Sequence, residues 1–226
     1  QEAGRHSVMV KGGKYLEAMD QADTIVFDKT GTLTNAQPFV QKVTPLGNYT
    51  RDEVLRIAAC LEEHFPHSLA NAVVKEAKQK GLDHNEYHSK VEYTVAHGIK
   101  STVNGEKVII GSYHFVFEDE HCVIPEGMEE KFAALPEEYS HLYLAIEGEL
   151  AAVICIHDPI RPEASAVINS LKRAGISKVV MMTGDSERTA KAVAEKLGID
   201  EYHAEVMPED KAMFIEKMQA DGNSVI

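Results

Sequence analysis

The chain has 226 residues and a formal net charge of −13, because 36 acidic residues outnumber 23 basic ones. This balance argues against a nucleic-acid partner, since binding a phosphate backbone requires a basic face. The length allows one large domain or two smaller ones, each with a buried core. Three cysteines, far apart and outside any C-x-x-C pattern, predict buried thiols in a reducing compartment: Cys60, Cys122 and Cys155.

No apolar run approaches the roughly 20 residues that span a bilayer, and the first residues lack the apolar core of a signal peptide. We therefore expect the chain itself to be soluble. It starts without Met and ends on the apolar residues Val225 and Ile226, so we interpret it as an excised fragment.

After a helical turn expected at residues 15–19, an apolar run at residues 24–27 predicts a buried strand. It leads directly into residues 28–34, which have the sequence DKTGTLT. Asp28 thus stands at the carboxyl end of a strand, where open parallel α/β sheets place their chemistry. A carboxylate there can attack phosphorus and form an aspartyl-phosphate, provided that a lysine, here Lys29, and a divalent cation offset the charge. We therefore predict that Asp28 is a nucleophile.

Residues 36–156 have a different pattern, and we predict that they form an inserted α+β domain with an antiparallel sheet. Thr50 and Glu53 form a capping-box signature for a helix that runs to about residue 61. Asn104-Gly105 is a residue pair that favours a type I′ hairpin turn. The predicted strands cover residues 39–43, 91–94, 99–111, 142–146 and 150–156. The other predicted helices cover residues 68–80, with Gly81 as the cap, and a charged stretch at 112–139.

From residue 157 onward, strands and helices alternate at lengths typical of a parallel sheet with right-handed crossovers. Residues 1–35 and 157–226 are therefore expected to form one α/β domain, which the insert interrupts. Its further predicted elements are a helix from residue 158 to about 174, a strand at 178–182, a helix at 187–197 and a helix from residue 208 to about 220.

Two further residues are expected to meet Asp28 at the carboxyl edge of this sheet. Thr183 follows a predicted strand and offers a hydroxyl, with nearby backbone N–H groups, to a transferred phosphoryl group. Lys211 stands near the start of a helix and offers a fixed cation for the charge that develops. Each residue alone is a weak signal, because Thr-Gly-Asp often forms a simple turn and lysines near helix starts are usually solvated.

Together these segments resemble P-type ATPases, which belong to the haloacid-dehalogenase-like superfamily. Residues 28–34 resemble the family's phosphorylation motif, and the later segments follow in the family's order. The resemblance implies a Rossmann-like parallel sheet that carries the phosphorylation chemistry. The residues that it implies are Asp28, Lys29, Thr30, Thr183 and Lys211 for catalysis, Asp28 and Thr30 for Mg²⁺, Gly184 and Asp185 at the nucleotide, and Asp158 and Arg161 at a hinge.

Thr30 refines this interpretation. In phosphatases of the superfamily, the second residue after the nucleophile is usually an aspartate that acts as general acid and base. A threonine there leaves no such base, so we expect water to attack the phosphorylated intermediate slowly. A pump needs this delay, whereas a phosphatase does not.

The insert is the candidate nucleotide-binding domain, because the chain has neither a G-x-x-x-x-G-K-[ST] loop nor a G-x-G-x-x-G fingerprint. Residues 66–70, PHSLA, resemble the His-Pro motif of heavy-metal-transporting P-type ATPases, with Ser68 where proline is usual. Residues 96–99, AHGI, resemble the family's Gly-x-Gly loop, with alanine in place of the first glycine. The nucleotide contacts that the resemblance implies are Glu62, His67, Ala96, Gly98 and Gly111.

The leading hypothesis is the ATP-binding and phosphorylation part of a heavy-metal P-type ATPase, on the cytoplasmic side of a membrane, with ATP and Mg²⁺ as cofactors. Its expected partners are the pump's own actuator domain and transmembrane helices, and a transition-metal ion as transported substrate. The family's Gly-Asp-Gly-x-Asn-Asp motif, whose carboxylate holds Mg²⁺, does not occur in the chain. We therefore expect weak or absent autophosphorylation of this fragment.

Two alternatives remain open at this point. The chain could be a free-standing phosphatase or phosphomutase with the insert as a cap, or a nucleotide-binding module without catalysis. Eleven histidines also raise the question of a metal site in the insert. His84 and His88 are four residues apart, but no third ligand follows at a persuasive spacing.

Overall fold

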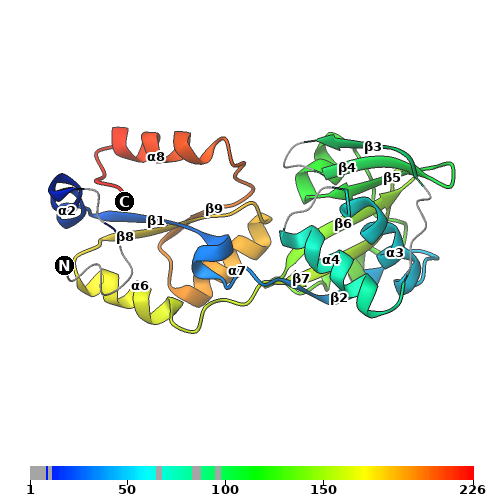
Figure 1. Cartoon of the computed structure of the whole chain (residues 1–226), viewed down its shortest axis with the longest axis horizontal. Coiled ribbons are helices and arrows are strands. Elements are labelled where there is room, and N and C mark those ends of the chain that lie inside the picture. Colours follow the sequence, from blue (N-terminus) through cyan, green and yellow to red (C-terminus); the bar gives the residue numbers. More distant parts are fainter. Residues whose placement is uncertain (1–8, 10–11, 65–67, 83–87, 95–97) are drawn as a thin grey trace.

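The computed structural model describes residues 9, 12–64, 68–82, 88–94 and 98–226, with the backbone alone for 88–94. The described residues form two sheets at opposite ends of an elongated molecule (Figure 1). One is parallel, with the strand order β1-β8-β9, and the other is antiparallel, with the order β2-β7-β6-β5-β4-β3. No described helix is both long and apolar enough to cross a membrane.

The parallel sheet combines segments from both ends of the chain. Its strands are β1 (Thr24–Asp28), β8 (Lys178–Met182) and β9 (Glu201–His203). Beyond β1, the last residues of the chain pair with its edge, where the Val26 N–H donates to the Ile226 carbonyl at 2.8 Å. The sheet therefore continues on that side with the segment at residues 224–226.

Helices cover both faces of this sheet, which is why β8 is apolar at nearly every position. Val179 and Met181 pack against α6 (Ala164–Arg173) and α7 (Glu187–Leu197). Val180 and Met182 face the opposite way, toward α8 (Lys211–Ala220). The remaining helix, α2 (Gly13–Asp20), lies at the far end of the molecule and has no buried residue (Figure 1).

The antiparallel sheet also has two covered faces. Helices α3 (Arg51–Glu62) and α4 (Ser68–Gln79) pack on one face, and residues 112–139, including α5 (Glu129–Ala133), pack on the other. The strands are β2 (Phe39–Pro45), β3 (His88–Thr94), β4 (Gly98–Val103), β5 (Glu106–Gly111), β6 (Ser140–Ile146) and β7 (Glu149–His157).

Local signals in the sequence place several of these elements. The capping box predicted for α3 is confirmed, because Glu53 N–H donates to Thr50 Oγ1 at 3.3 Å and Thr50 N–H donates to Glu53 Oε2 at 2.8 Å. Asn104 and Gly105 both have positive φ angles, as a type I′ turn requires. The thiols of all three cysteines are buried, as predicted.

Two sequence predictions are wrong. Residues 112–139 are not mainly helical, because their apolar side chains must reach the sheet at irregular intervals. Only α5 and a wide helical turn at residues 114–119 are helical there. Helix α6 begins at Ala164 and not at residue 158, because the residues before it bond to the chain after Asp28. In that contact, Arg161 N–H donates to Leu33 O at 2.9 Å.

The chain enters and leaves the antiparallel part through adjacent segments (Figure 1). Asn35 N–H donates to Pro159 O at 3.0 Å, Thr34 and Ile160 form an antiparallel bridge, and Phe39 pairs with His157. These paired crossings place the antiparallel part beyond the carboxyl end of β1. The edge of the sheet that carries Asp28 therefore faces the insert.

Candidate functional site

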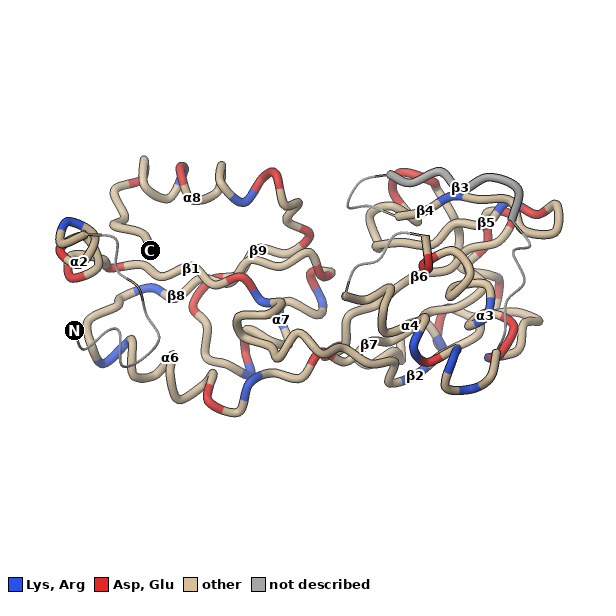
Figure 2. Tube along the Cα trace, in the orientation of Figure 1, with Lys and Arg blue, Asp and Glu red and all other residues tan. Residues whose placement is uncertain are grey.

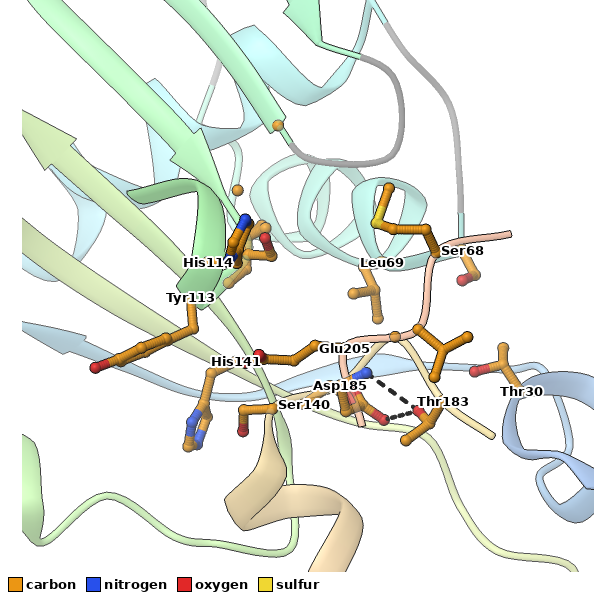
Figure 3. A pocket seen from close by; sticks show the side chains of 18 of the residues that line it. Thr30, Ser68, Leu69, Tyr113, His114, Ser140, His141, Thr183, Asp185 and Glu205 are labelled. Carbon is orange, nitrogen blue, oxygen red and sulfur yellow. Dashed lines mark hydrogen bonds between the residues drawn. The ribbon is translucent and has the colours of Figure 1, made fainter. Parts of the chain in front are cut away.

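A cavity of about 810 Å³ lies between the two parts of the molecule. Figure 3 shows Ser68 and Leu69 of α4 on one side of it and Thr30 and Thr183 on the other. Cavities of this size suit ligands with several rings and charged groups. Among the residues named from the sequence, those that line it are Lys29, Thr30, Glu62, Gly98, Gly111, Asp158, Thr183, Gly184, Asp185 and Lys211.

Asp28 is the last residue of β1, and its side chain is 47% exposed. Lys211, the first residue of α8, places its Nζ atom 3.1 Å from Asp28 Oδ1. In the register of the sheet, Asp28 is opposite Met182, the residue before Thr183. The sheet thus brings together the three residues that the sequence predicts to converge. The Asp28 carboxylate is open to solvent and has one cation beside it.

The residues after Asp28 form a closed turn. Gly31 has a φ angle of 81°, which favours glycine, and its N–H donates to Thr34 Oγ1 at 3.0 Å. The Thr34 hydroxyl donates to Asp158 Oδ2 at 2.6 Å, and Arg161 Nε donates to Thr32 O at 2.9 Å. The turn is therefore bound to the segment that returns from the antiparallel sheet.

Lys29 is buried and points to a different carboxylate. Its ammonium group forms an ion pair with Asp185 and donates to Ser140 Oγ at 3.2 Å. Thr183 Oγ1 donates to Asp185 Oδ2 at 2.8 Å and accepts from the Asp185 N–H at 3.1 Å (Figure 3). Burial raises the pKa of Asp185, but the Lys29 ammonium and hydrogen bonds from Ser140 and Thr183 hold that pKa below its usual value.

This arrangement differs from the sequence prediction for Lys29. We expected Lys29 to offset the charge of Asp28, but Lys211 occupies that position and Lys29 neutralises Asp185. Ser140, which completes the buried group, is a residue that sequence reasoning missed. It stands 111 positions from Lys29, and no motif marks it.

The insert contributes two glycines to the cavity wall, beside larger side chains such as Tyr113 and His141. Gly98 and Gly111 are opposite each other on β4 and β5. A Cβ atom on Gly98 would overlap the carbonyl oxygen of Ile110 and the ring of Phe115, so only glycine fits there. Glu62, the last residue of α3, is buried beside this wall. His67 and Ala96, which the sequence also indicates, lie outside the described residues.

Glu205 is another cavity residue that sequence reasoning missed. It has a φ angle of 54°, and its N–H donates to Asp185 O at 2.9 Å, which holds the loop after β9 against the cavity. Burial raises the pKa of the Glu205 carboxyl, and the negative charge of Glu118 raises it further. The sequence around Glu205 indicates neither its positive φ angle nor its proximity to Glu118 of the insert.

The two Mg²⁺ ligands that the resemblance implies, the Asp28 carboxylate and the Thr30 carbonyl, are oxygen donors, which Mg²⁺ prefers. In addition, Asp158 Oδ1 is buried and has no hydrogen-bond partner among the described residues. The sequence also raises the question of a metal site among the histidines of the insert. Within the described residues, no group of three His, Cys, Asp or Glu side chains is arranged to hold a metal ion. His84 lies outside the described residues.

Comparisons with known proteins identify the family to which the chain belongs. Residues 22–226 match the model of the haloacid dehalogenase-like hydrolases, and the chain belongs to this family. It is 36% identical over 219 residues to the manganese-exporting P-type ATPase of Mycobacterium tuberculosis, which covers 96% of the chain and 30% of that protein. It is also 36% identical over 223 residues to copper-transporting ATPase 2 of Rhizobium meliloti, which covers 99% of the chain and 27% of that protein.

A solved structure supports the same relationship. The catalytic domain of the CPx-ATPase CopB-B superposes with a TM-score of 0.70 at 28% identity, covering 96% of the chain and 74% of that domain. The predicted fold class and the resemblance to heavy-metal P-type ATPases are thereby confirmed. The chain spans 30% or less of the two curated relatives named above.

Proposed function

We propose that the chain is the ATP-binding and phosphorylation part of a heavy-metal cation-transporting P-type ATPase, in which Asp28 accepts the γ-phosphoryl group of ATP. The observation that carries this proposal is the position of Asp28, at the carboxyl end of β1, with Lys211 Nζ at 3.1 Å and a cavity of about 810 Å³ next to it. A half-exposed carboxylate with a fixed cation is suited to attack on a polyphosphate.

The proposed step is an in-line displacement. An oxygen of Asp28 forms a bond to the γ-phosphorus, the bond from that phosphorus to the bridging oxygen breaks, and ADP leaves with the bonding electrons. Lys211 would stabilise the charge that develops on the phosphoryl oxygens, and Thr183 would offer its hydroxyl and nearby backbone. Mg²⁺, held by Asp28 and the Thr30 carbonyl, would supply further neutralisation when bound.

The insert would bind the nucleoside end of ATP. Gly98 and Gly111 both line the cavity and would offer backbone to a ligand, and the buried Glu62 can accept a hydrogen bond from an adenine amino group. Under this proposal, residues 36–156 are the nucleotide-binding domain, and residues 1–35 and 157–226 are the phosphorylation domain. Asp158 and Arg161 lie at the crossing between them and would act as the hinge.

Thr30 favours a pump over a phosphatase. A side chain without a carboxylate at this position cannot activate water, so the aspartyl-phosphate would persist until another domain promotes its hydrolysis. We propose that an actuator domain of the intact protein has this role, and that transmembrane helices carry the transported ion. The two relatives are named for different metals, manganese and copper. The transported ion that we propose is therefore a transition-metal ion, without a choice among the metals.

Phosphorylation of the 226-residue chain alone is proposed to be weak. Asp28 and one backbone carbonyl offer two oxygens, and a protein site for Mg²⁺ relies on its carboxylates even when the metal keeps several waters. Nucleotide binding, by contrast, depends on the insert, which the chain contains. Binding is therefore the measurement suited to this chain.

Calorimetric titration of the chain with ATP tests the proposal. We expect His67→Ala to weaken ATP binding and Asp28→Asn to leave it unchanged, because the two residues would contact opposite ends of the nucleotide. Unchanged binding in His67→Ala would contradict the assigned role of the insert. Steady turnover of small phosphomonoesters by the unchanged chain would favour the phosphatase alternative instead.

A further inference from the structure

The start of α7 makes a further contact with the insert, which begins beside the crossings at residues 34–39 and 157–160, where the rings of Tyr139 and His157 have centroids 5.2 Å apart. Arg188 Nη2 donates to the carbonyl oxygens of Ala133 and Leu135, both at 2.9 Å. Its Nε atom donates to Glu137 Oε1 at 2.7 Å. One guanidinium group of the phosphorylation part thus binds three acceptors on one loop of the insert. Hydrogen bonds from a charged donor are among the stronger ones in proteins.

The contact continues inward from Arg188. Thr189 is fully buried, and its hydroxyl donates to Tyr139 O at 2.9 Å. Next along the insert, Ser140 accepts from Lys29 Nζ inside the cavity. We call Arg188 and Thr189, with residues 133–140 of the insert, the latch. Its hydrogen bonds lead from the exposed Arg188 through Thr189 and Ser140 to Lys29, the residue after Asp28.

Such a contact restricts how the insert can be oriented. The two crossings attach the insert along one line, and an attachment along a line permits rotation about it. The bonds to α7 restrict this rotation, because the Tyr139 carbonyl and the three acceptors of Arg188 would lose their partners if the insert swung away. While these bonds are formed, the wall with Gly98 and Gly111 keeps its position relative to Asp28.

We propose that Arg188 and Thr189 are positioning residues, which hold the insert in the orientation that presents bound nucleotide to Asp28. Ser140 connects these bonds to the residue after Asp28, since it follows Tyr139 and accepts from Lys29 Nζ at 3.2 Å. Neither Arg188 nor Thr189 lines the cavity of about 810 Å³, so neither is expected to touch the nucleotide. The effect on phosphorylation rests on the proposed function, whereas the effect on orientation does not.

Small-angle X-ray scattering of the 226-residue chain tests the orientation. We expect Arg188→Gln and Thr189→Val, singly and together, to increase the radius of gyration. Loss of hydrogen bonds from a charged donor should shift the equilibrium between docked and undocked insert by about tenfold or more. Arg173→Gln is the matched control, because Arg173 bonds only to Ser170 of its own helix in the described contacts.

Scattering curves of all variants that superpose on that of the unchanged chain would overturn the proposal. Circular dichroism identifies a variant that fails to fold. Should Thr189→Val fail to fold, Arg188→Gln decides, since the Arg188 side chain is 37% exposed and a glutamine there keeps a polar side chain in contact with solvent.

Kinetics in the longer parent protein separate positioning from folding. We expect Arg188→Gln to lower the rate of Asp28 phosphorylation at saturating ATP by about tenfold, with ATP affinity unchanged, because Arg188 does not line the cavity. An equal loss of affinity and rate, or no change in either, would contradict a positioning role. If the unchanged parent is not phosphorylated at all, the proposed function fails while the scattering result stands.

Discussion

At the scale of single residues, two carboxylates of the site show how surroundings decide a role. Asp28 is half exposed and has Lys211 beside it, so its oxygens are open to a substrate. Asp185 is buried and bound by Lys29 and Thr183, so its oxygens are occupied. The resemblance places Asp185 at the nucleotide, and the residue does line the cavity, but its carboxylate is bound by other side chains of the protein.

We expect Asp185→Asn to destabilise the chain by about 3–5 kcal/mol in urea unfolding at pH 7, because it leaves the Lys29 ammonium buried without a counterion. The pKa of Asp185 is lowered in the folded state. Its stabilising effect is therefore present above the ordinary aspartate pKa of about 3.9 and is lost as the pH falls below it.

The stability difference between the unchanged chain and Asp185→Asn should consequently be constant from about pH 7 to pH 5 and shrink below about pH 4. Asp221→Asn is the control, since Asp221 is exposed after the end of α8 and should change stability little. A difference that stays the same across this whole range would show that Asp185 is not ionised in the folded protein.

The sequence predicts the convergence of Asp28, Thr183 and Lys211, because strand order and chain direction determine where the carboxyl ends of parallel strands meet. It does not predict that Lys29 turns away from Asp28. That outcome depends on Ser140, which reaches the site only through the docking of the insert. Pairings of this kind are properties of the folded surface and leave no local signal.

At the scale of secondary structure, the glycine pair on β4 and β5 joins the sheet to the cavity. Strands β4 and β5 pair in the antiparallel sheet. At Gly98, the Ile110 carbonyl and the Phe115 ring occupy the space that a side chain would need. The cavity wall and the sheet core are thus the same two strands. A change that separates them should alter stability and ligand binding together.

We expect Gly98→Ala to weaken ATP binding by about tenfold or more and to lower stability by about 1–3 kcal/mol, because the added methyl group must displace β5 or the ring of Phe115. Calorimetry with ATP and urea unfolding measure the two effects. Gly13→Ala is the control, because a Cβ at Gly13 has open space around it. Full ATP affinity in Gly98→Ala would rule out close approach of the nucleotide at this wall.

Elements with strong local signals could be predicted from the sequence, and those without could not. Strand β8 and helix α7 have their predicted bounds, since apolar periodicity and the glycine after α7 both indicate them. Strand β9 has three residues, too few for any periodicity, and it exists because β8 offers it an open edge. The irregular course of residues 112–139 follows the shape of the sheet beneath it.

At the scale of the whole molecule, the site exists because one chain builds both of its walls. The chain leaves the parallel part after the turn at residues 28–34 and returns beside it at residues 157–161, so the insert is attached next to the nucleophile. Figure 2 shows acidic residues over both parts, with fewer basic ones among them. A polyphosphate must therefore be bound by a few local cations, such as Lys211.

The change from alternating strands and helices to an antiparallel pattern allows the insert to be inferred from the sequence. Its orientation could not be inferred, because the bonds that fix it join residues about 50 positions apart and depend on carbonyl groups, which every residue has. The size of the cavity follows from that orientation. The nucleophile is thus predictable from the sequence, while the space in front of it is not.

Phosphorylation of the longer parent protein, which we propose contains this chain, tests the central claim most directly. After brief exposure to γ-labelled ATP and an acid quench, we predict a label that is stable in acid, released by hydroxylamine, located on the peptide with Asp28 and absent in Asp28→Asn. Continuous release of phosphate without an acid-stable label, or a label on any other residue, would contradict the account.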